Sequence, residues 1–298
     1  MKKRSSLIVF ALVMAMVIVA GGCKKKPEPI VITPDIEKNH LQRNHIFGTV
    51  KSIETTTFYL AEDSLTLSDT NKLASLLKKR IPDITGKQTY SSDGFLLSFY
   101  KYGPDKKAIL HRIYRYDKEA KLNNWNEYDS TNATAVTGLC IYDRNHFLIG
   151  EQIYHGDSMA MAFSYTNDGI GNHINSTQSF GDCITHTEYK YNEFGLVYKI
   201  IEHEPNGKVF KTAKIEYDNY GDEVNRCIYK SGNQMIEYTY NEYDQDGRQL
   251  KTIYEDKIHH VKEFSYYSNY DSQLNWQTEI KIVDNQIISV RNRKIIYY

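Results

Sequence analysis

A five-residue motif recurs along this chain at nearly constant spacing, and it constrains the fold more than any other feature. The motif opens with tyrosine, continues with Asp or Asn, and in its clearest copies ends with glycine, as at residues 191–195 (YNEFG). Further copies begin at 26-residue intervals at Tyr217 and Tyr243, and looser copies begin at Tyr90, Tyr116, Tyr142, Tyr165 and Tyr270. Repeats of this length predict one supersecondary unit per copy, stacked on its neighbours.

Each repeat carries two turn signals and therefore predicts one β-hairpin. An Asp or Asn followed three residues later by Gly matches a type I turn closed by a left-handed residue. Glycine holds that last position in five copies and other residues hold it in three: Gly94, Gly169, Gly195, Gly221 and Gly247, against Ala120, His146 and Leu274. The second signal falls about halfway between copies, at residues 103–105, 156–157, 181–182, 205–207, 231–233 and 284–285. The eight copies predict an all-β antiparallel meander of roughly sixteen strands.

Side chains alternate along a strand, so the residue two positions before each repeat tyrosine shares the face of that tyrosine. In the middle copies this residue is mostly apolar and in the outer copies it is polar: Tyr114, Cys140, Phe163, Tyr189 and Ile215, against Gln88, Asn241 and Ser268. We therefore expect a packed inner stripe in the middle of the array and none at its ends. Open sheets rarely exceed about ten strands without curling, so we expect a tube or spiral, with a sandwich as the alternative.

From about residue 88 to the C-terminus the repeated motif resembles the YD repeats of RHS proteins. The resemblance rests on the Tyr-Asp-x-x-Gly copies, of which residues 217–221 (YDNYG) and 243–247 (YDQDG) are typical. It implies a spiral β-sheet shell, and the chain is similar to small YD-repeat lipoproteins of Gram-negative envelopes. The resemblance implies a fold and a compartment but no particular activity.

The N-terminus predicts a lipid anchor. Three basic residues precede an apolar run from Leu7 to Ala20, which is too short to span a bilayer and typical of a signal peptide. Residues 20–23 (AGGC) resemble a lipobox, so we expect residues 1–22 to be removed and Cys23 to be lipidated. Residues 23–44 predict a flexible tether. Lys24 stands where an inner-membrane retention signal would carry Asp, which favours the outer membrane and leaves its face undecided.

Residues 45–87 predict a strand followed by the one helix that we expect in the mature chain. Residues 46–59 are rich in β-branched and aromatic residues. Ser68 and Asp69 predict the start of a helix that continues along an apolar stripe until Pro82, the stripe being Leu73, Leu76, Leu77 and Ile81. We expect this helix to cover the first strands or the open end of the sheet, because an exposed edge invites pairing with other chains. The alternative is a helix that docks a partner.

No arrangement of residues predicts a catalytic, cofactor or metal site. The thiols of Cys140, Cys183 and Cys227 should lie three or four strands apart, so we expect them to be free and mostly buried. The histidines show no metal spacing: His259 and His260 should point to opposite faces of a strand, and His203 lies at a turn.

Acidic and aromatic residues leave two possibilities open. A carboxylate pair for glycoside hydrolysis could lie among residues that mostly serve turns, namely Glu202, Glu204, Asp218, Asp222, Glu223, Glu237, Glu242, Asp244 and Asp246. Trp125 and Trp276, if exposed beside neighbouring tyrosines, would suit carbohydrate or protein binding; these tyrosines are Tyr128, Tyr266, Tyr267 and Tyr270. Cross-strand aromatic packing is the structural alternative for both tryptophans.

These features predict a lipid-anchored, non-enzymatic envelope protein that binds or scaffolds a protein or glycan. A glycan-acting hydrolase is the alternative. Without Lys2, Lys3 and Arg4 the chain carries three more acidic than basic residues, which leaves no basic footprint for nucleic acid. A porin-like barrel is disfavoured, because Lys211, Lys214 and Glu237 place charge on both strand faces.

Overall fold

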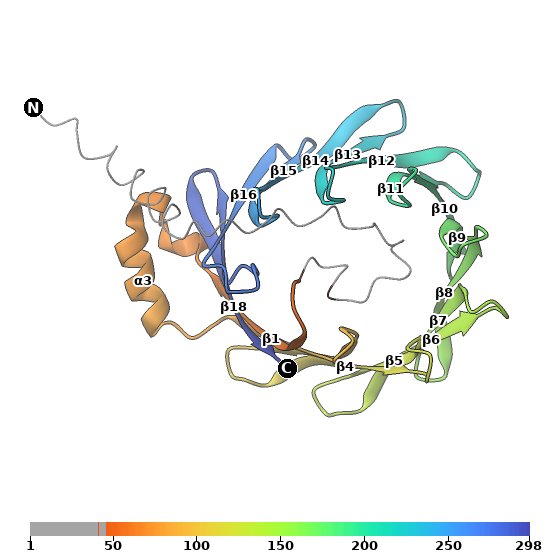
Figure 1. The fold of residues 1–298 in the computed structure, drawn as a ribbon, viewed down its shortest axis with the longest axis horizontal. Coiled ribbons are helices and arrows are strands. Elements are labelled where there is room, and N and C mark those ends of the chain that lie inside the picture. Colours follow the sequence, from red (N-terminus) through yellow and green to blue (C-terminus); the bar gives the residue numbers. More distant parts are fainter. Residues whose placement is uncertain (1–40, 42–45) are drawn as a thin grey trace, which may run out of the picture. The chain divides into compact units, whose positions relative to one another are not determined.

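The described part of the chain, Leu41 and residues 46–298, forms a closed antiparallel β-barrel in the computed structural model (Figure 1). Each of its eighteen strands pairs with the next strand along the chain, and the first strand also pairs with the last. β1 (Val50–Tyr59) lies between β18 (Gln286–Tyr297) and β2 (Ile84–Tyr90), which closes the barrel at what we call the seam. The predicted all-β meander that rolls into a tube is therefore confirmed, and the sandwich is not formed.

The eight predicted hairpins account for β2 to β17, and β1 and β18 are added outside them. The intervening strands are β3 (Leu96–Tyr102), β4 (Ala108–Tyr116), β5 (Leu122–Tyr128), β6 (Thr134–Tyr142), β7 (Leu148–His155), β8 (Ser158–Asn167), β9 (His173–Phe180), β10 (Cys183–Tyr191), β11 (Val197–His203), β12 (Val209–Tyr217), β13 (Glu223–Lys230), β14 (Gln234–Tyr243), β15 (Gln249–Asp256), β16 (Val261–Ser268) and β17 (Thr278–Val283).

The repeated motif forms the turns at one end of the barrel. In seven of the eight turns an Asp or Asn side chain accepts backbone N–H groups two and four residues ahead, as Asp244 does from Asp246 (2.9 Å) and Arg248 (3.0 Å). In the first turn the Ser91 hydroxyl accepts the N–H of Phe95 (3.1 Å). The last position is left-handed even where glycine is absent, with φ of 61° at Ala120, 66° at His146 and 70° at Leu274. The motif is therefore a structural corner.

One copy of the motif lies two residues later than predicted. Gly169 does not have a positive φ, whereas Gly171 does, at 94°. The turn starts at Asp168, and Asn167 takes the place of the repeat tyrosine. Its amide donates to the Leu148 carbonyl oxygen (2.9 Å), as the tyrosine hydroxyls of other copies do.

The repeat tyrosines connect consecutive hairpins. Six of the eight hydroxyls donate to a backbone carbonyl near the start of the preceding hairpin's return strand: Tyr116 to Leu96 (2.8 Å), Tyr142 to Leu122 (2.9 Å), Tyr191 to His173 (2.9 Å), Tyr217 to Val197 (2.8 Å), Tyr243 to Glu223 (3.3 Å) and Tyr270 to Gln249. Across the seam, the Tyr298 hydroxyl donates to the Tyr90 carbonyl oxygen (2.6 Å). The bonds from the repeat tyrosine hydroxyls explain why tyrosine rather than phenylalanine recurs at the first position of the motif.

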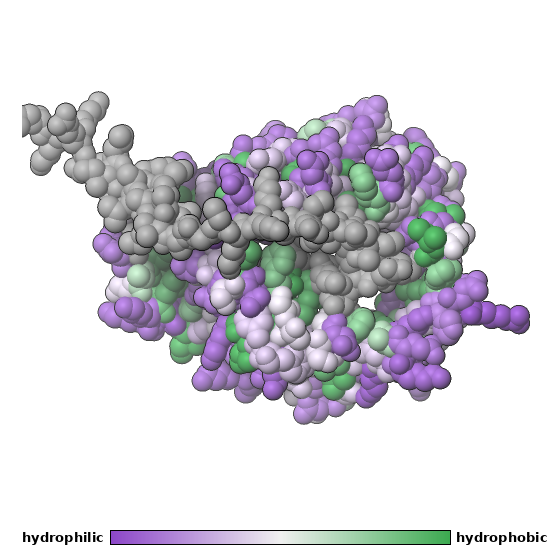
Figure 2. Space-filling view, viewed as in Figure 1, coloured by the Kyte–Doolittle hydropathy of each residue, from purple (hydrophilic) through white to green (hydrophobic). Residues whose placement is uncertain are grey.

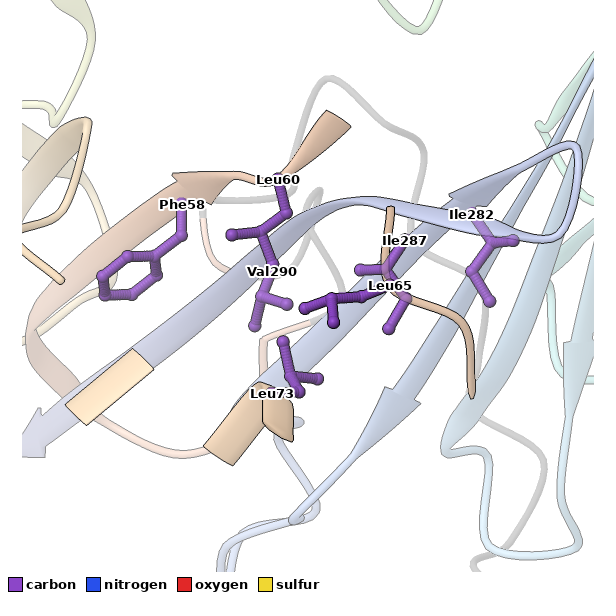
Figure 3. Packing of buried hydrophobic residues seen from close by; sticks show 7 residues of the cluster. All are labelled: Phe58, Leu60, Leu65, Leu73, Ile282, Ile287 and Val290. Atoms are coloured by element: carbon purple, nitrogen blue, oxygen red, sulfur yellow. The ribbon is translucent and has the colours of Figure 1, made fainter. Parts of the chain in front are cut away.

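The tightest apolar packing lies at the seam. Phe58 and Val290 pack with Leu73 of helix α3 (Thr70–Lys79) on the outer face of the barrel, in a cluster that also holds Leu60, Leu65, Ile282 and Ile287 (Figure 3). Ile53 lies five residues from Phe58 and so faces inward, where it packs with Tyr90 and Leu41. The prediction of a packed inner stripe in the middle of the array is wrong, since of its five members Ile215 is buried and the other four are half-buried.

Helix α3 covers the outside of the seam, as predicted for a covering helix (Figure 1). Asp69 stands at its N-cap position, but its carboxylate bonds the backbone and hydroxyl of Thr66 instead of the helix. Hydrogen bonds from Lys72 and Thr66 lower the pKa of Asp69 to about 2. Of the predicted tether, Leu41 is buried on the inner face, and its N–H donates to the Gly94 carbonyl oxygen (3.4 Å). Cys23, the signal peptide and the rest of the tether lie outside the described residues.

Candidate functional site

Four aromatic side chains form a continuous row on the outer face of β3, β4 and β5. Tyr100 lies directly opposite His111, and His111 directly opposite Tyr128. Ring centroids are 3.8 Å apart for Tyr100 and His111, 5.2 Å for His111 and Tyr128, and 5.8 Å for Tyr100 and Tyr102. We call these four residues the aromatic row.

Strand pairing places the aromatic row on the outside and adds charged residues to its end. Tyr100 is opposite Lys87, and Lys87 is opposite Glu54, which shares the face of Phe58 and therefore of helix α3. Lys294 of β18 continues this line beyond Glu54. The outer surface thus carries one straight line of side chains across six strands, charged at one end and aromatic at the other.

The four rings are half-buried, and the His111 side chain is uncharged, as an apolar surface requires. Burial lowers the pKa of His111, so its imidazole is neutral at neutral pH, and burial raises the pKa of Tyr102. The Nε2 atom of His111 is buried and has no hydrogen-bond partner in the described structure. Flat aromatic faces with a few polar atoms can stack on sugar rings or on side chains of another protein.

The aromatic row was not predicted, although a sequence signal for it exists. Tyr100 is five residues and His111 six residues from the centre of the turn at residues 103–107, and they face each other because a bulge between Lys101 and Tyr102 shifts the register by one residue. The partner of His111 across the next turn depends in the same way on a bulge between Arg115 and Tyr116. A register that allows for this bulge gives Tyr128.

The two tryptophans do not form an exposed binding surface. Trp125 is 8% exposed and Trp276 is 9% exposed. An arginine covers each ring, with Arg112 4.2 Å from Trp125 and Arg293 3.4 Å from Trp276. Burial lowers the pKa of Arg293 to about 10. Of the neighbouring tyrosines, Tyr267 packs on Trp276 (5.2 Å), Tyr266 packs on the seam cluster, Tyr270 connects two hairpins, and only Tyr128 belongs to the aromatic row.

Most of the acidic candidates serve turns or ion pairs. Asp218 and Asp244 accept backbone N–H groups, and Glu223 pairs with Arg226 (2.6 Å). The remaining candidates are dispersed: Glu204, Asp222 and Asp246 lie in turns, Glu202 ends β11 and Glu242 lies in β14. One facing carboxylate pair exists, formed by Glu237 of β14 and Asp256 of β15, and Lys211 is 3.6 Å from Glu237.

The three later cysteines are free thiols, on β6, β10 and β13, so the predicted strand separation is confirmed. The prediction that they are mostly buried is wrong, because Cys183 is exposed and the other two are half-buried. Burial followed by the charge of Glu151 raises the pKa of Cys140 to about 12, so this thiol is unreactive at neutral pH. His259 and His260 lie in a turn rather than a strand, and His259 pairs with Asp256 (2.7 Å).

Sequence comparison identifies no relative of this chain. No family model matches, and no curated protein matches. Within the described residues, no helix has the length and apolar character needed to cross a membrane.

Comparison with solved structures gives matches at low identity and with TM-scores below 0.5, among them the following. A porin-like protein from Bacteroides uniformis has 12% identity and a TM-score of 0.44, with 84% of this chain and 98% of that chain covered. One from Bacteroides vulgatus has 11% identity and a TM-score of 0.38, over 63% and 92% of the two chains. The Photorhabdus luminescens Tc holotoxin pore has 12% identity and a TM-score of 0.33; 67% of this chain matches, but it spans only 14% of that chain.

Proposed function

We propose that this protein is a lipid-anchored, non-enzymatic protein of the outer membrane whose barrel binds a glycan or protein through the aromatic row. The observation that supports this most directly is the row itself, since Tyr100, His111 and Tyr128 stack side by side on an outer face. A sheet that only needed a core would place such rings inward. The YD-repeat resemblance supports an envelope location.

The charged residues of the outer face also favour a surface that is exposed to water, with the aromatic row as its binding site. The end of the barrel seen in Figure 2 is mostly hydrophilic, with apolar residues in small separate patches. Lys214 faces Lys199 across β11 and β12 on the outside, and Glu188 lies on the neighbouring strand. These charges would oppose burial in lipid, so we assign membrane attachment to Cys23.

The anchor and the binding surface can be tested separately. Cys23→Ser should move the full chain from the membrane to the soluble fraction and abolish incorporation of labelled palmitate. Wild-type protein should then recover a specific glycan or protein from native envelopes, and the double variant Tyr100→Ala/His111→Ala should lose it. Tyr198→Ala, which removes a ring that is 43% exposed outside the row, is the matched control.

The outcomes distinguish the two halves of the proposal. A Cys23→Ser protein that stays in the membrane would contradict the lipid anchor. Equal recovery by wild type and the double variant would contradict the binding role of the row. The identity of the captured molecule decides between glycan and protein.

A glycan-acting hydrolase is the second candidate, and the facing pair of Glu237 and Asp256 is the observation that favours it. Directly opposite residues have Cβ atoms about 4.5–5.5 Å apart, which is compatible with a retaining carboxylate pair. Burial and then Glu237, Asp256 and Glu263 raise the pKa of neighbouring Tyr254. Release of reducing ends from envelope or plant glycans that disappears in Glu237→Gln and Asp256→Asn would establish this activity and overturn the non-enzymatic assignment.

A further inference from the structure

A shallow hollow of about 370 Å³ lies on β9, β10 and β11, away from the aromatic row. The residues that line it include His186, Glu188, His203 and Thr177. His186 lies directly opposite His203, and Glu188 follows His186 by two residues, so all three project from the same outer face. Two residues of one strand and one of its neighbour thus surround a single patch of sheet.

The imidazole of His203 faces a carboxylate in an arrangement that calls for a cation. Its Nδ1 lies 3.2 Å from the Gly207 carbonyl oxygen, which can only accept, so Nδ1 carries the proton. The other ring nitrogen, Nε2, lies 3.0 Å from Oε1 of Glu188, and a cation that both atoms bind satisfies this contact, either a proton on Nε2 or a metal ion. Nε2 is buried and makes no hydrogen bond of acceptable geometry in the described structure.

That separation is close to the spacing of two ligands on one metal ion. Nitrogen and oxygen ligands lie about 2.0–2.2 Å from zinc, so two of them at a tetrahedral angle are about 3.3–3.6 Å apart, and a small widening of the His203–Glu188 contact would admit the ion. Metal-binding histidines usually hold their other ring nitrogen through a second partner, which fixes the ring. His203 has this partner in Gly207, and His186 has it in the Thr177 hydroxyl, 3.0 Å from Nδ1.

From this geometry we infer a zinc-class divalent cation site formed by His203, Glu188 and His186. Among the described residues no three His, Cys, Asp or Glu side chains already meet at one point, so the third ligand must move into place. His186 is exposed, so a change of rotamer that gives up its present contact with Thr177 can bring its ring to the cation, and it stands directly opposite His203 across the strands. Imidazole nitrogen with one carboxylate suits Zn²⁺ rather than Ca²⁺ or Mg²⁺, and the fourth position is open to water.

Titration of the full chain with Zn²⁺ and with Co²⁺ tests the site. We expect one Zn²⁺ per chain, and Co²⁺ absorption bands of a tetrahedral site with nitrogen and oxygen ligands. His203→Ala, Glu188→Gln and His186→Ala should each weaken Zn²⁺ binding by at least tenfold. His155→Ala, an exposed histidine on β7, should leave it unchanged.

The nearby exposed thiol of Cys183 requires its own control. The Cys183→Ser protein should bind Zn²⁺ as wild type does. Loss of binding in Cys183→Ser, or sulfur-to-cobalt charge-transfer bands, would assign the ion to a thiolate and overturn the site. Absence of saturable binding, or equal affinity in all three ligand variants, would overturn it as well.

Discussion

The seam and the repeat array of the same barrel are stabilised in different ways. The large side chains that are buried most deeply belong to the seam, and they include Val50, Ile53, Leu60, Ile287 and Val290. Between β4 and β14 a few buried residues, such as Trp125 and Ile215, are dispersed among half-buried residues, turn carboxylates and tyrosine hydroxyls. In the array every hairpin has a neighbour of the same design, so polar contacts that repeat every 26 residues can hold it.

The seam cannot use those contacts alone, because β1 belongs to no repeat and meets β18 from the opposite end of the chain. Its closure requires long-range pairing, which costs loop entropy before any contact forms. Burial of apolar surface under helix α3 offsets this cost. A repeat sheet therefore becomes a closed barrel when a non-repeat segment supplies an apolar seal.

Removal of a side chain from the seam should have the largest effect. Leu60→Ala removes a fully buried side chain. The backbone N–H of residue 60, which donates to the Ile288 carbonyl oxygen (2.8 Å), is kept in the variant. We expect a loss of about 2–5 kcal/mol in the free energy of unfolding, measured by urea denaturation. Leu139→Ala, at a position 39% exposed in the array, should cost well under half of that. Equal losses would show that the seam is no more stabilising than the array.

Gly138 of β6 is the array position most sensitive to added volume. A Cβ at this position would lie 2.2 Å from the indole of Trp125, so Gly138→Ala must displace that ring and its contact with Arg112. We expect a loss of roughly 1–3 kcal/mol, with a red shift of tryptophan emission. Gly169→Ala is the control, because the methyl group of an alanine there would meet no atom within 4 Å and the φ of this residue is not positive. A neutral Gly138→Ala would mean that Trp125 is not packed against β6.

The tyrosine contacts of the array should each be worth less than one buried seam residue. Tyr217→Phe removes the hydroxyl that donates to Val197 (2.8 Å) and keeps the ring. We expect a loss of about 0.5–1.5 kcal/mol in urea denaturation. Tyr198→Phe, at a ring 43% exposed, should be neutral. If both variants are neutral, the hydroxyl contact does not hold neighbouring hairpins together.

Local and long-range features differ in how far the sequence predicts them. The turn role of Asp244 and the strand separation of Cys140 and Cys183 follow from spacing alone, because a hairpin is set by its turn. Asn167 was missed because Tyr165 fits the motif, while an amide can donate to Leu148 as well as a hydroxyl can.

The inward position of the tryptophans and the burial at the seam depend on contacts between distant segments. Val290 lies opposite Phe58, more than 200 residues away along the chain, and no local pattern announces that pairing. The aromatic row is intermediate, since each of its two cross-strand pairs follows from a local hairpin only once the bulge beside the turn is allowed for. Register errors of one residue would have moved every ring to the other face.

The smallest expected effect on the free energy of unfolding comes from the left-handed turn positions of the array that lack glycine, and this effect should be stabilising. Ala120 adopts φ of 61°, a conformation that strains an L-residue and costs glycine nothing. Ala120→Gly should therefore raise the free energy of unfolding by about 0.4–1 kcal/mol, net of the extra freedom of the unfolded chain. Ala162→Gly in the middle of β8 should instead lower it by roughly 0.5–1 kcal/mol. A loss of stability in both variants would show that the corner at Ala120 is not held in the left-handed conformation, and that its turn differs from the glycine corners at Gly195 and Gly221.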